Sequence, residues 1–313
     1  MCSILSVEIK EINEEQFGKC LSMNNGVIEA VVTIDFGPRI IKFGLADGPN
    51  MLYQDAEKRY TIDTEELRAC YGAESRFHLY GGHRLWISPE RNPESYYPDN
   101  EPVVYSPLPD GVRFIPPRQR QRELQLSIEI MMNPDAHDIM VVHCAQNISK
   151  ERTHISLWGI TALQPGGTMI LPQNTTDTGT LANRSLSFWP YSQMDDRRFF
   201  LGNRYITLTQ DAQVTGAFKL GVNNHSGWCA YARENCSFIK RYVHIHDVRY
   251  PDFGSSFEAY TNGDLIEMET LSPIYAVEPK EMVRHVENWS VFSTQNAPHP
   301  RDEEAIERFV NSL

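Results

Sequence analysis

A group of side chains suited to sugar recognition follows the glycine pair at 81–82. His83, Arg84 and Trp86 come next, and Glu90 lies four positions beyond the tryptophan. Two adjacent glycines let the backbone approach another group closely. An indole face covers the C–H surface of a sugar ring, while guanidinium, imidazole and carboxylate groups hydrogen-bond to its hydroxyls. The alternative is a proline-rich surface loop in which Trp86 belongs to the core and His83 is a structural histidine.

Two carboxylates stand in an apolar stretch nearer the C-terminus. Glu267 and Glu269 are two residues apart, so in a strand they share one face while Ile266 and Met268 take the other. Such a pair is either solvated at the protein surface or directed into a polar cleft. In a cleft, one of the two carboxylates can act as a general base.

A pair of histidines, His244 and His246, is a third candidate. Imidazoles at i and i+2 on a strand can bind one metal ion, as in cupin barrels. Cupins, however, carry a glycine before the pair and a glutamate a few residues after it, and here the next glutamate is Glu258. We therefore expect a surface or cleft-rim pair and no metal. Phosphate loops, serine-hydrolase elbows and His-Glu-x-x-His motifs are absent from the sequence, so no cofactor is expected either.

The composition excludes several classes of protein. The chain has 313 residues, with 41 acidic and 29 basic side chains and a formal net charge of −12. Binding to nucleic acid requires a basic face, so this partner is excluded. No stretch approaches the ~18 apolar residues of a membrane span, and the N-terminus lacks a signal-peptide pattern. Six scattered cysteines without a CxxC pair indicate reduced thiols and a cytoplasmic location.

Hydrophobic alternation with period 2 dominates the chain and indicates strands. Clear examples are residues 27–34, 124–130, 204–209 and 214–220. Many short strands separated by turn residues predict an all-β sandwich or barrel. The alternation stops between 81 and 102. Two helices are expected, a short one at 64–70 and an amphipathic one at 302–310. No repeat or linker composition divides the chain, so one domain over 1–313 is expected.

Four motifs in this order resemble those of the galactose mutarotase-like (aldose 1-epimerase-like) superfamily. Residues 36–41 (Phe-Gly-Pro-Arg-Ile-Ile) are similar to the Gly-Ala-Arg-Ile strand entry, and 81–89 to the Gly-Gly…Trp-Pro segment of the hexose-phosphate branch. Residues 267–273 resemble the strand that carries the catalytic base, and 278–281 the turn before the final strand. The likeness runs from Val27 to Phe292. It is closest to a bacterial branch with Gly-Gly-His-Arg-Leu-Trp and Glu-x-Glu-Thr-Leu-Ser-Pro signatures.

The resemblance implies a β-supersandwich, in which two large antiparallel sheets face each other and one forms a concave sugar-binding cleft. It also implies interconversion of the α and β anomers of an aldose, with Glu269 as the base. Partial burial would raise the pKa of such a base toward neutrality. The family's acid histidine would fall within 155–161, which contains no histidine. His83 is the best substitute as the acid.

The leading hypothesis is therefore a protein that binds, and epimerises, a small carbohydrate. Beside Glu269 and His83, the residues expected to bind the substrate are Arg39, Arg84, Trp86, Glu90, Trp158, Trp189, Lys219 and His246. For Lys219 the alternatives are binding of an anionic group or an exposed position on a strand. Basic side chains at 39, 83, 84 and 219 would favour an acidic sugar or sugar phosphate.

Two other hypotheses stay open. The missing family histidine supports a non-catalytic carbohydrate-binding module. A metal-dependent β-barrel enzyme that uses His244 and His246 is the third alternative. The identity of the sugar and the oligomeric state do not follow from the sequence.

Overall fold

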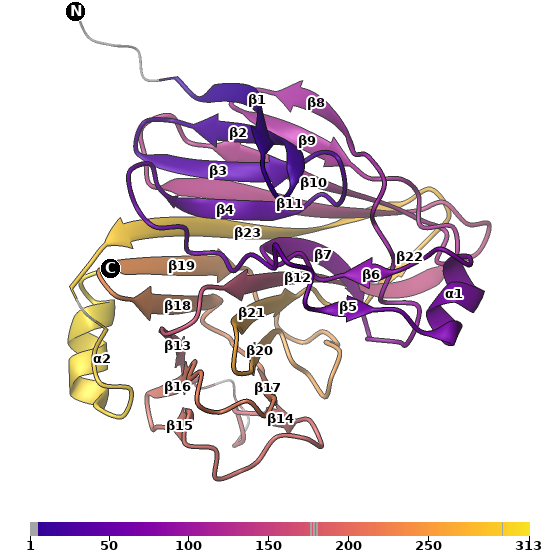
Figure 1. Ribbon diagram of the computed structural model, residues 1–313. Helices are drawn as coiled ribbons and strands as arrows, with labels where there is room; N and C mark the ends of the chain where they lie inside the picture. Colours follow the sequence, from indigo (N-terminus) through magenta and orange to yellow (C-terminus); the bar gives the residue numbers. More distant parts are fainter. Residues whose placement is uncertain (1–5, 176, 178, 180, 296) are drawn as a thin grey trace, which may run out of the picture.

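The computed structural model describes residues 6–175, 177, 179, 181–295 and 297–313. Two large antiparallel sheets face each other, and the helices α1 and α2 lie at opposite ends of the sandwich (Figure 1). The first sheet has eleven strands. Its order is β1 (Glu8–Glu14), β2 (Gly18–Asn24), β3 (Ile28–Thr33), β4 (Ile40–Leu45), β7 (His83–Ser88), β12 (Thr153–Leu163), β21 (Ile266–Leu271), β20 (Phe257–Thr261), β17 (Phe218–Val222) and β14 (Leu186–Phe188), and β22 (Tyr275–Val277) also pairs with β12.

The second sheet has ten strands. Its order is β15 (Phe199–Leu201), β16 (Tyr205–Thr209), β13 (Thr168–Pro172), β18 (Trp228–Arg233), β19 (Cys236–Tyr242), β23 (Met282–Ser293), β11 (Asp138–Asn147), β10 (Leu124–Met132), β9 (Gly111–Ile115) and β8 (Val104–Leu108). A separate two-stranded ribbon pairs β5 (Thr61–Ile62) with β6 (Phe77–His78). The expected all-β supersandwich is confirmed.

One hydrophobic core fills the space between the sheets. Phe43 of β4 packs edge-on against Phe238 of β19 and Trp289 of β23, with ring centroids 5.7 and 5.5 Å apart, respectively. The same cluster extends from Leu21 to Val291. Because period-2 alternation sends every second side chain inward, most strands of both sheets contribute to this core from one face. A core shared by both sheets supports the expectation of one domain over 1–313, which stays a prediction.

Both expected helices are present. Helix α1 spans Glu65–Tyr71 and is capped by the side chain of Thr64. Helix α2 spans Glu303–Val310, and the Asp302 side chain accepts a hydrogen bond from the backbone N–H of Ala305 at its first turn. The buried face of α2 packs on strands of the second sheet. Asp302 at the N-cap and Glu303 and Glu304 in the first turn stabilise the start of this helix.

The segment at 81–102 differs from its prediction, because residues 83–88 form β7 in the middle of the first sheet. The glycines that precede it serve packing of the chain itself. Gly81 and Gly82 have φ of 79° and 64°, and an added Cβ would lie 2.3 Å from the Tyr53 carbonyl oxygen and 2.1 Å from that of Ile40. The strand expected at 214–220 is displaced, since β17 begins only at Phe218.

Among the described residues, no helix is long and apolar enough to cross a membrane. Cys20, Cys70, Cys144, Cys229 and Cys236 are free thiols, and four of the five are buried. Cys2 lies outside the described residues.

Candidate active site

A cavity of about 480 Å³ opens on the face of the first sheet that points away from the second. Its floor is formed by the adjacent strands β7, β12, β21, β20 and β17, and the β5–β6 ribbon contributes to its wall. This volume suits a small molecule. The lining residues are Arg59, Tyr60, Thr61, Ile62, Phe77, Leu79, Arg84, Trp86, Glu90, Tyr96, Trp158, Ile160, Trp189, Tyr191, Lys219, Tyr260, Asn262, Leu265, Glu267 and Glu269.

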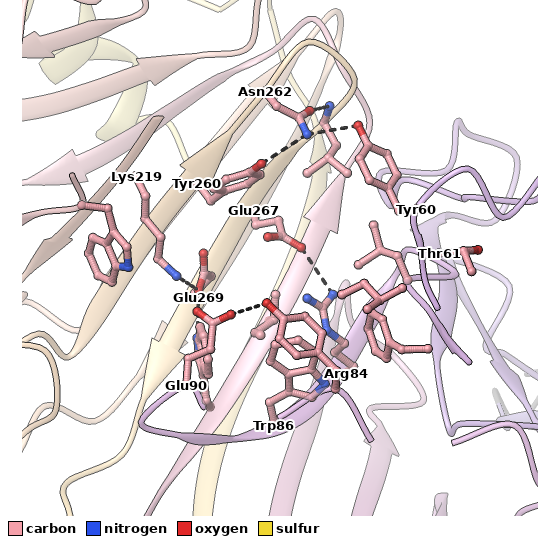
Figure 2. Close-up of a pocket in the computed structure, with 18 of the residues that line it drawn as sticks. Tyr60, Thr61, Arg84, Trp86, Glu90, Lys219, Tyr260, Asn262, Glu267 and Glu269 are labelled. Carbon is pink, nitrogen blue, oxygen red and sulfur yellow. Dashed lines mark hydrogen bonds and ion pairs between the residues drawn. The ribbon is translucent and has the colours of Figure 1, made fainter. Parts of the chain in front are cut away.

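Strand alternation explains which side chains reach this cavity. On β21, Glu267 and Glu269 line it, while Ile266 and Met268 belong to the core between the sheets. This is the division that the sequence predicted for the strand. Figure 2 shows Glu267 and Glu269 on the cavity floor, with Lys219 reaching Glu269 from β17.

Glu269 is almost completely buried, with 1% of its surface exposed. Its Oε2 accepts hydrogen bonds from Trp158 Nε1 and Lys219 Nζ, both at 2.9 Å. Its Oε1 is buried and has no hydrogen-bond partner among the residues that the structure describes. A buried acceptor without a partner is rare in folded proteins and costs free energy. Two donors thus anchor one oxygen of Glu269, whereas no described residue anchors the other.

Lys219 stands between two carboxylates, with its Nζ 2.8 Å from Glu258 and 2.9 Å from Glu269. It also lies 4.7 Å from the ring centres of Trp158 and Trp189, within cation–π distance. Burial disfavours the charged form of Lys219, but the attraction of the two carboxylates outweighs it and raises the pKa well above its ordinary value. The ammonium therefore stays protonated at neutral pH.

One ammonium cannot neutralise two buried carboxylates. Burial raises the pKa of Glu258 well above its usual range, and it also raises that of Glu269; in both cases Lys219 offsets the rise only in part. A carboxylate with a raised pKa accepts a proton more readily at neutral pH, as a general base must. Glu258 borders a neighbouring cavity of about 340 Å³, whose wall also includes Glu90, Trp158 and Trp189.

Arg84 and the aromatic side chains form the other half of the floor. The guanidinium carbon of Arg84 lies 4.6 Å from the ring centre of Trp86, and its Nη1 donates to Glu267 Oε1 at 3.3 Å. The Tyr96 hydroxyl donates to Glu90. The Trp86 and Trp158 rings pack edge to face with centroids 5.6 Å apart. Apolar rings beside fixed polar groups match the two kinds of surface on a sugar.

Sequence reasoning missed several lining residues. Tyr60, Tyr260 and Asn262 form a connected polar group at the far end of the cavity, since the Asn262 amide donates to both hydroxyls. Tyr260, and Glu258 of the neighbouring cavity, could have been found from the alternation within β20, which sends both to one face. Tyr60 carried no such signal, because it precedes a two-residue strand.

The expectation that His83 lies in the cleft needs correction. Its ring is completely buried on the opposite face of β7, where Nε2 lies 2.7 Å from His143 Nε2 and Nδ1 lies 2.8 Å from Thr161 Oγ1. His83 is absent from the cavity lining, which includes Arg84 and Trp86. Successive side chains of a strand point to opposite faces, so His83 and Arg84 cannot both face the cleft.

Arg39 and His246 also lie outside this cavity. Arg39 is 2% exposed and makes a two-point ion pair with Asp99, at 2.5 and 3.0 Å, where it fixes the loop before β4. His246 lines a different cavity together with His225 and His244. His244 and His246 were expected on a strand but lie in the loop after β19, which ends at Tyr242. The structure brings together Arg84, Trp86, Glu90, Trp158, Trp189, Lys219 and Glu269.

The cleft is not basic. Among its described lining residues, Arg59, Arg84 and Lys219 face three carboxylates, those of Glu90, Glu267 and Glu269. Arg84 is paired with Glu267, and Lys219 with Glu269. The expected preference for an acidic sugar rested partly on Arg39 and His83, which lie elsewhere, so its electrostatic basis is removed.

Solved structures similar to this chain share its fold at low sequence identity. A galactose mutarotase-like protein from Lactobacillus casei matches with a TM-score of 0.57 and 11% identity, over 87% of this chain and 100% of that one. A galactose mutarotase-like protein from Clostridium acetobutylicum matches with a TM-score of 0.55 and 13% identity, over 92% and 99%. The chain has the galactose mutarotase-like fold. No family model and no curated protein sequence matches it.

A TPR-domain containing protein from Parabacteroides distasonis has the same fold over part of its length. It matches with a TM-score of 0.60 and 13% identity, and the match covers 95% of this chain but 55% of that one. Within this fold, β12 occupies the place where the resemblance put the acid histidine. Its side chains that face the cavity are Trp158 and Ile160, so β12 supplies no imidazole there.

Proposed function

We propose that this protein binds a small aldose in the cavity over β7, β12, β21, β20 and β17 and interconverts its α and β anomers. The observation that carries the proposal is Glu269 Oε1, a buried carboxylate oxygen without a partner among the described residues, in the wall of a cavity rich in aromatic rings. Similar structures named galactose mutarotase-like proteins support the reaction class.

The reaction needs one proton to leave the anomeric hydroxyl and one to reach the ring oxygen. Glu269 Oε1 accepts the hydroxyl proton, and the electrons of that O–H bond form the aldehyde C=O as the bond from C1 to the ring oxygen breaks. The ring oxygen takes a proton from an acid. Rotation about the C1–C2 bond and closure by the reverse steps give the other anomer, with no net change of atoms or electrons.

We assign the acid to Lys219. The anomeric and ring oxygens are bonded to the same carbon, so an acid and a base that serve both must themselves be neighbours. Lys219 Nζ lies 2.9 Å from Glu269. The carboxylates of Glu269 and Glu258 both raise the pKa of the Lys219 ammonium when no substrate is bound. When Glu269 accepts a proton, its part of this attraction disappears, so the buried ammonium becomes more acidic. Uptake of one proton thus promotes release of the other.

A neutral aldose is the substrate class that suits the charges of the cavity. Its cations are balanced by carboxylates, and the Arg84–Glu267 pair offers both donors and acceptors to hydroxyls. Trp86, Trp158 and Trp189 offer ring faces and edges to the C–H surfaces of a sugar.

The decisive experiment compares the wild type with Glu269→Gln by NMR measurement of anomer exchange on a panel of neutral hexoses and uronates. We expect the variant to lose about 10²–10⁴-fold in the rate of exchange while it still binds sugar. The wild-type rate should fall as the pH drops through the raised pKa of Glu269, because protonation removes the base. Glu90→Gln, in the same cavity, should weaken sugar binding, but its exchange rate should fall at low pH in the same way as that of the wild type.

Two results would contradict the enzymatic proposal. One is an exchange rate in Glu269→Gln equal to that of the wild type. The other is saturable sugar binding, measured by quenching of tryptophan fluorescence, without acceleration of exchange at any pH. The second result would identify a non-catalytic carbohydrate-binding module.

A further inference from the structure

Three histidines converge at a second cavity, of about 300 Å³, which shares no lining residue with the sugar-binding candidate. His225 comes from the loop between β17 and β18, and His244 and His246 come from the loop after β19. One ring nitrogen of each histidine lies within 4.8 Å of those of the other two. The ring centroids are 4.7 to 5.1 Å apart. Two separate loops thus bring three imidazoles to one point.

The ring of His244 is held in place by its surroundings. Its Nδ1 lies 2.8 Å from Ser256 Oγ, and the ring stacks on Tyr250 with centroids 5.0 Å apart. This contact uses Nδ1 and leaves Nε2 for another partner. A hydrogen bond from the second ring nitrogen to a protein group is the usual way in which metal-binding histidines are oriented.

The other two rings are less tightly held. His225 Nδ1 is buried and has no hydrogen-bond partner among the described residues, and its Nε2 lies 3.1 Å from the amide nitrogen of Asn223. Binding through Nδ1 would satisfy the buried nitrogen; binding through Nε2 would replace the contact with Asn223. His246 is exposed and lies in the same loop as His244. Its loop position lets its ring move toward the other two.

We propose that His225, His244 and His246 bind one divalent transition-metal ion of the Zn²⁺ class. Imidazole nitrogens suit zinc, copper and nickel, whereas magnesium and calcium require oxygen ligands. Zinc binds histidine nitrogen at about 2.0–2.1 Å, which in a tetrahedron corresponds to nitrogens about 3.3 Å apart. The ring nitrogens are now up to 4.8 Å apart, so they must move about 1.5 Å toward one another to reach this separation.

The protonation state of the cluster favours this role. Burial and the neighbouring rings lower the pKa of His244 to about 4, and burial also lowers that of His225. Both imidazoles are therefore neutral at pH 7, and a neutral imidazole is the form that coordinates a metal. The three histidines line the cavity, so a water molecule can complete the tetrahedron.

The test is titration of the full-length protein, freed of metal with EDTA, with Zn²⁺ in competition with a chromophoric chelator. We expect one equivalent to bind and the melting temperature to rise with occupancy, because a ligand that binds only the folded state stabilises it. Co²⁺ in place of Zn²⁺ should give the visible absorption of a tetrahedral site. His225→Ala and His246→Ala should each weaken binding at least 100-fold, since loss of a supporting partner alone costs about 10–100-fold.

His154→Ala is the matched control, because His154 is an exposed histidine on β12 outside the cluster, and it should bind Zn²⁺ like the wild type. His246 is exposed, so its removal is not expected to prevent folding. The proposal is overturned if Zn²⁺ does not bind in stoichiometric amount, or if both cluster variants retain the wild-type affinity. Anomer exchange is not part of the test, so its outcome is independent of the function proposed for the first cavity.

Discussion

Two buried lysine–glutamate pairs lie on opposite sides of the same strands, β12 and β21. On the cleft side, Lys219 contacts Glu269 at 2.9 Å. On the inner side, between the sheets, Lys240 contacts Glu287 at 3.1 Å, and both side chains are fully buried. Lys240 Nζ also donates to Thr161 Oγ1 at 2.6 Å. The residue types and the pair distances are nearly the same, so their different roles must come from the remaining contacts.

The difference lies in the completeness of hydrogen bonding. Both oxygens of Glu287 are occupied, Oε1 by Lys240 and the Thr270 hydroxyl, and Oε2 by Trp289 Nε1 at 2.7 Å. Burial opposes ionisation of Glu287, but Lys240 holds its pKa well below the usual range. Glu269 has one oxygen without a partner among the described residues, and burial raises its pKa. A saturated buried carboxylate is fixed in its charged form, whereas an unsaturated one remains available for proton transfer.

The inner network also explains a residue of β12. An added Cβ at Gly159 would lie 2.6 Å from Glu287 Oε1 and 3.3 Å from the His143 ring. A side chain at this position would therefore displace the network between the sheets. The strand presents Trp158 and Ile160 to the cleft and keeps its inner face free at Gly159.

The largest expected effect tests the cleft pair. Lys219→Met removes the proposed proton donor and leaves Glu258 and Glu269 without a counter-charge. We expect the rate of anomer exchange, measured by NMR, to fall about 10²–10⁴-fold, while circular dichroism shows a folded protein. Lys219→Arg keeps the charge and tests the proton transfer alone. A rate within threefold of the wild type in the Met variant would refute Lys219 as the acid.

Substitution in the inner pair, Lys240 and Glu287, should lower the stability of the protein. Glu287→Gln leaves Lys240 buried without its counter-charge, and breaking such a pair costs about 3–5 kcal/mol of unfolding free energy. Urea denaturation measures this loss. Glu269→Gln is the matched variant and should cost less than about 2 kcal/mol, because Lys219 keeps Glu258 as a partner. Equal losses in the two variants would contradict the distinction between the pairs.

Acid should destabilise the inner network. Burial lowers the pKa values of His83, His143 and His285, the last to about 3. Below pH ~6.5 the histidines bind protons in the unfolded chain but stay neutral in the folded chain. The free energy of unfolding therefore has its full value above this pH and falls as the pH drops. Each histidine contributes at most about 1.4 kcal/mol per pH unit. Urea midpoints at pH 7.5, 6.5 and 5.5 measure the slope, and constant stability across this range would be incompatible with neutral buried histidines.

The smallest effect on the rate of anomer exchange is expected for His83→Asn. His83 contacts His143 and Thr161 on the inner side, so its loss should cost about 1–3 kcal/mol of stability through unsatisfied partners. The exchange rate of the folded variant should stay within threefold of the wild type in the same NMR assay. An exchange rate of His83→Asn as low as that of Lys219→Met would indicate that His83 is the acid.

Much of the fold was predictable because it depends on local patterns. The alternation at 124–130 predicted β10 within two residues of its end, and the amphipathic pattern of 302–310 predicted α2. The prediction was wrong at 214–217, where Gly216 and Ala217 lie before the start of β17 at Phe218 and have a low preference for strands. It was incomplete at 81–90, where β7 was not recognised. Recognition of a strand there would have placed His83 and Arg84 on opposite faces.

The sequence by itself determined that the chain is built from strands and that Glu267 and Glu269 share one face of an apolar strand, since both follow from the period of side chains along the backbone. Only the tertiary structure decided which strand faces lie together in the cavity. Lys219, Glu258 and Glu269 lie on three adjacent strands, yet β17 is 50 residues away from β21 along the chain at the Lys219–Glu269 contact. The pairing of distant strands depends on packing of the whole chain, which no local pattern records. The same holds for the Glu269 oxygen that has no partner among the described residues.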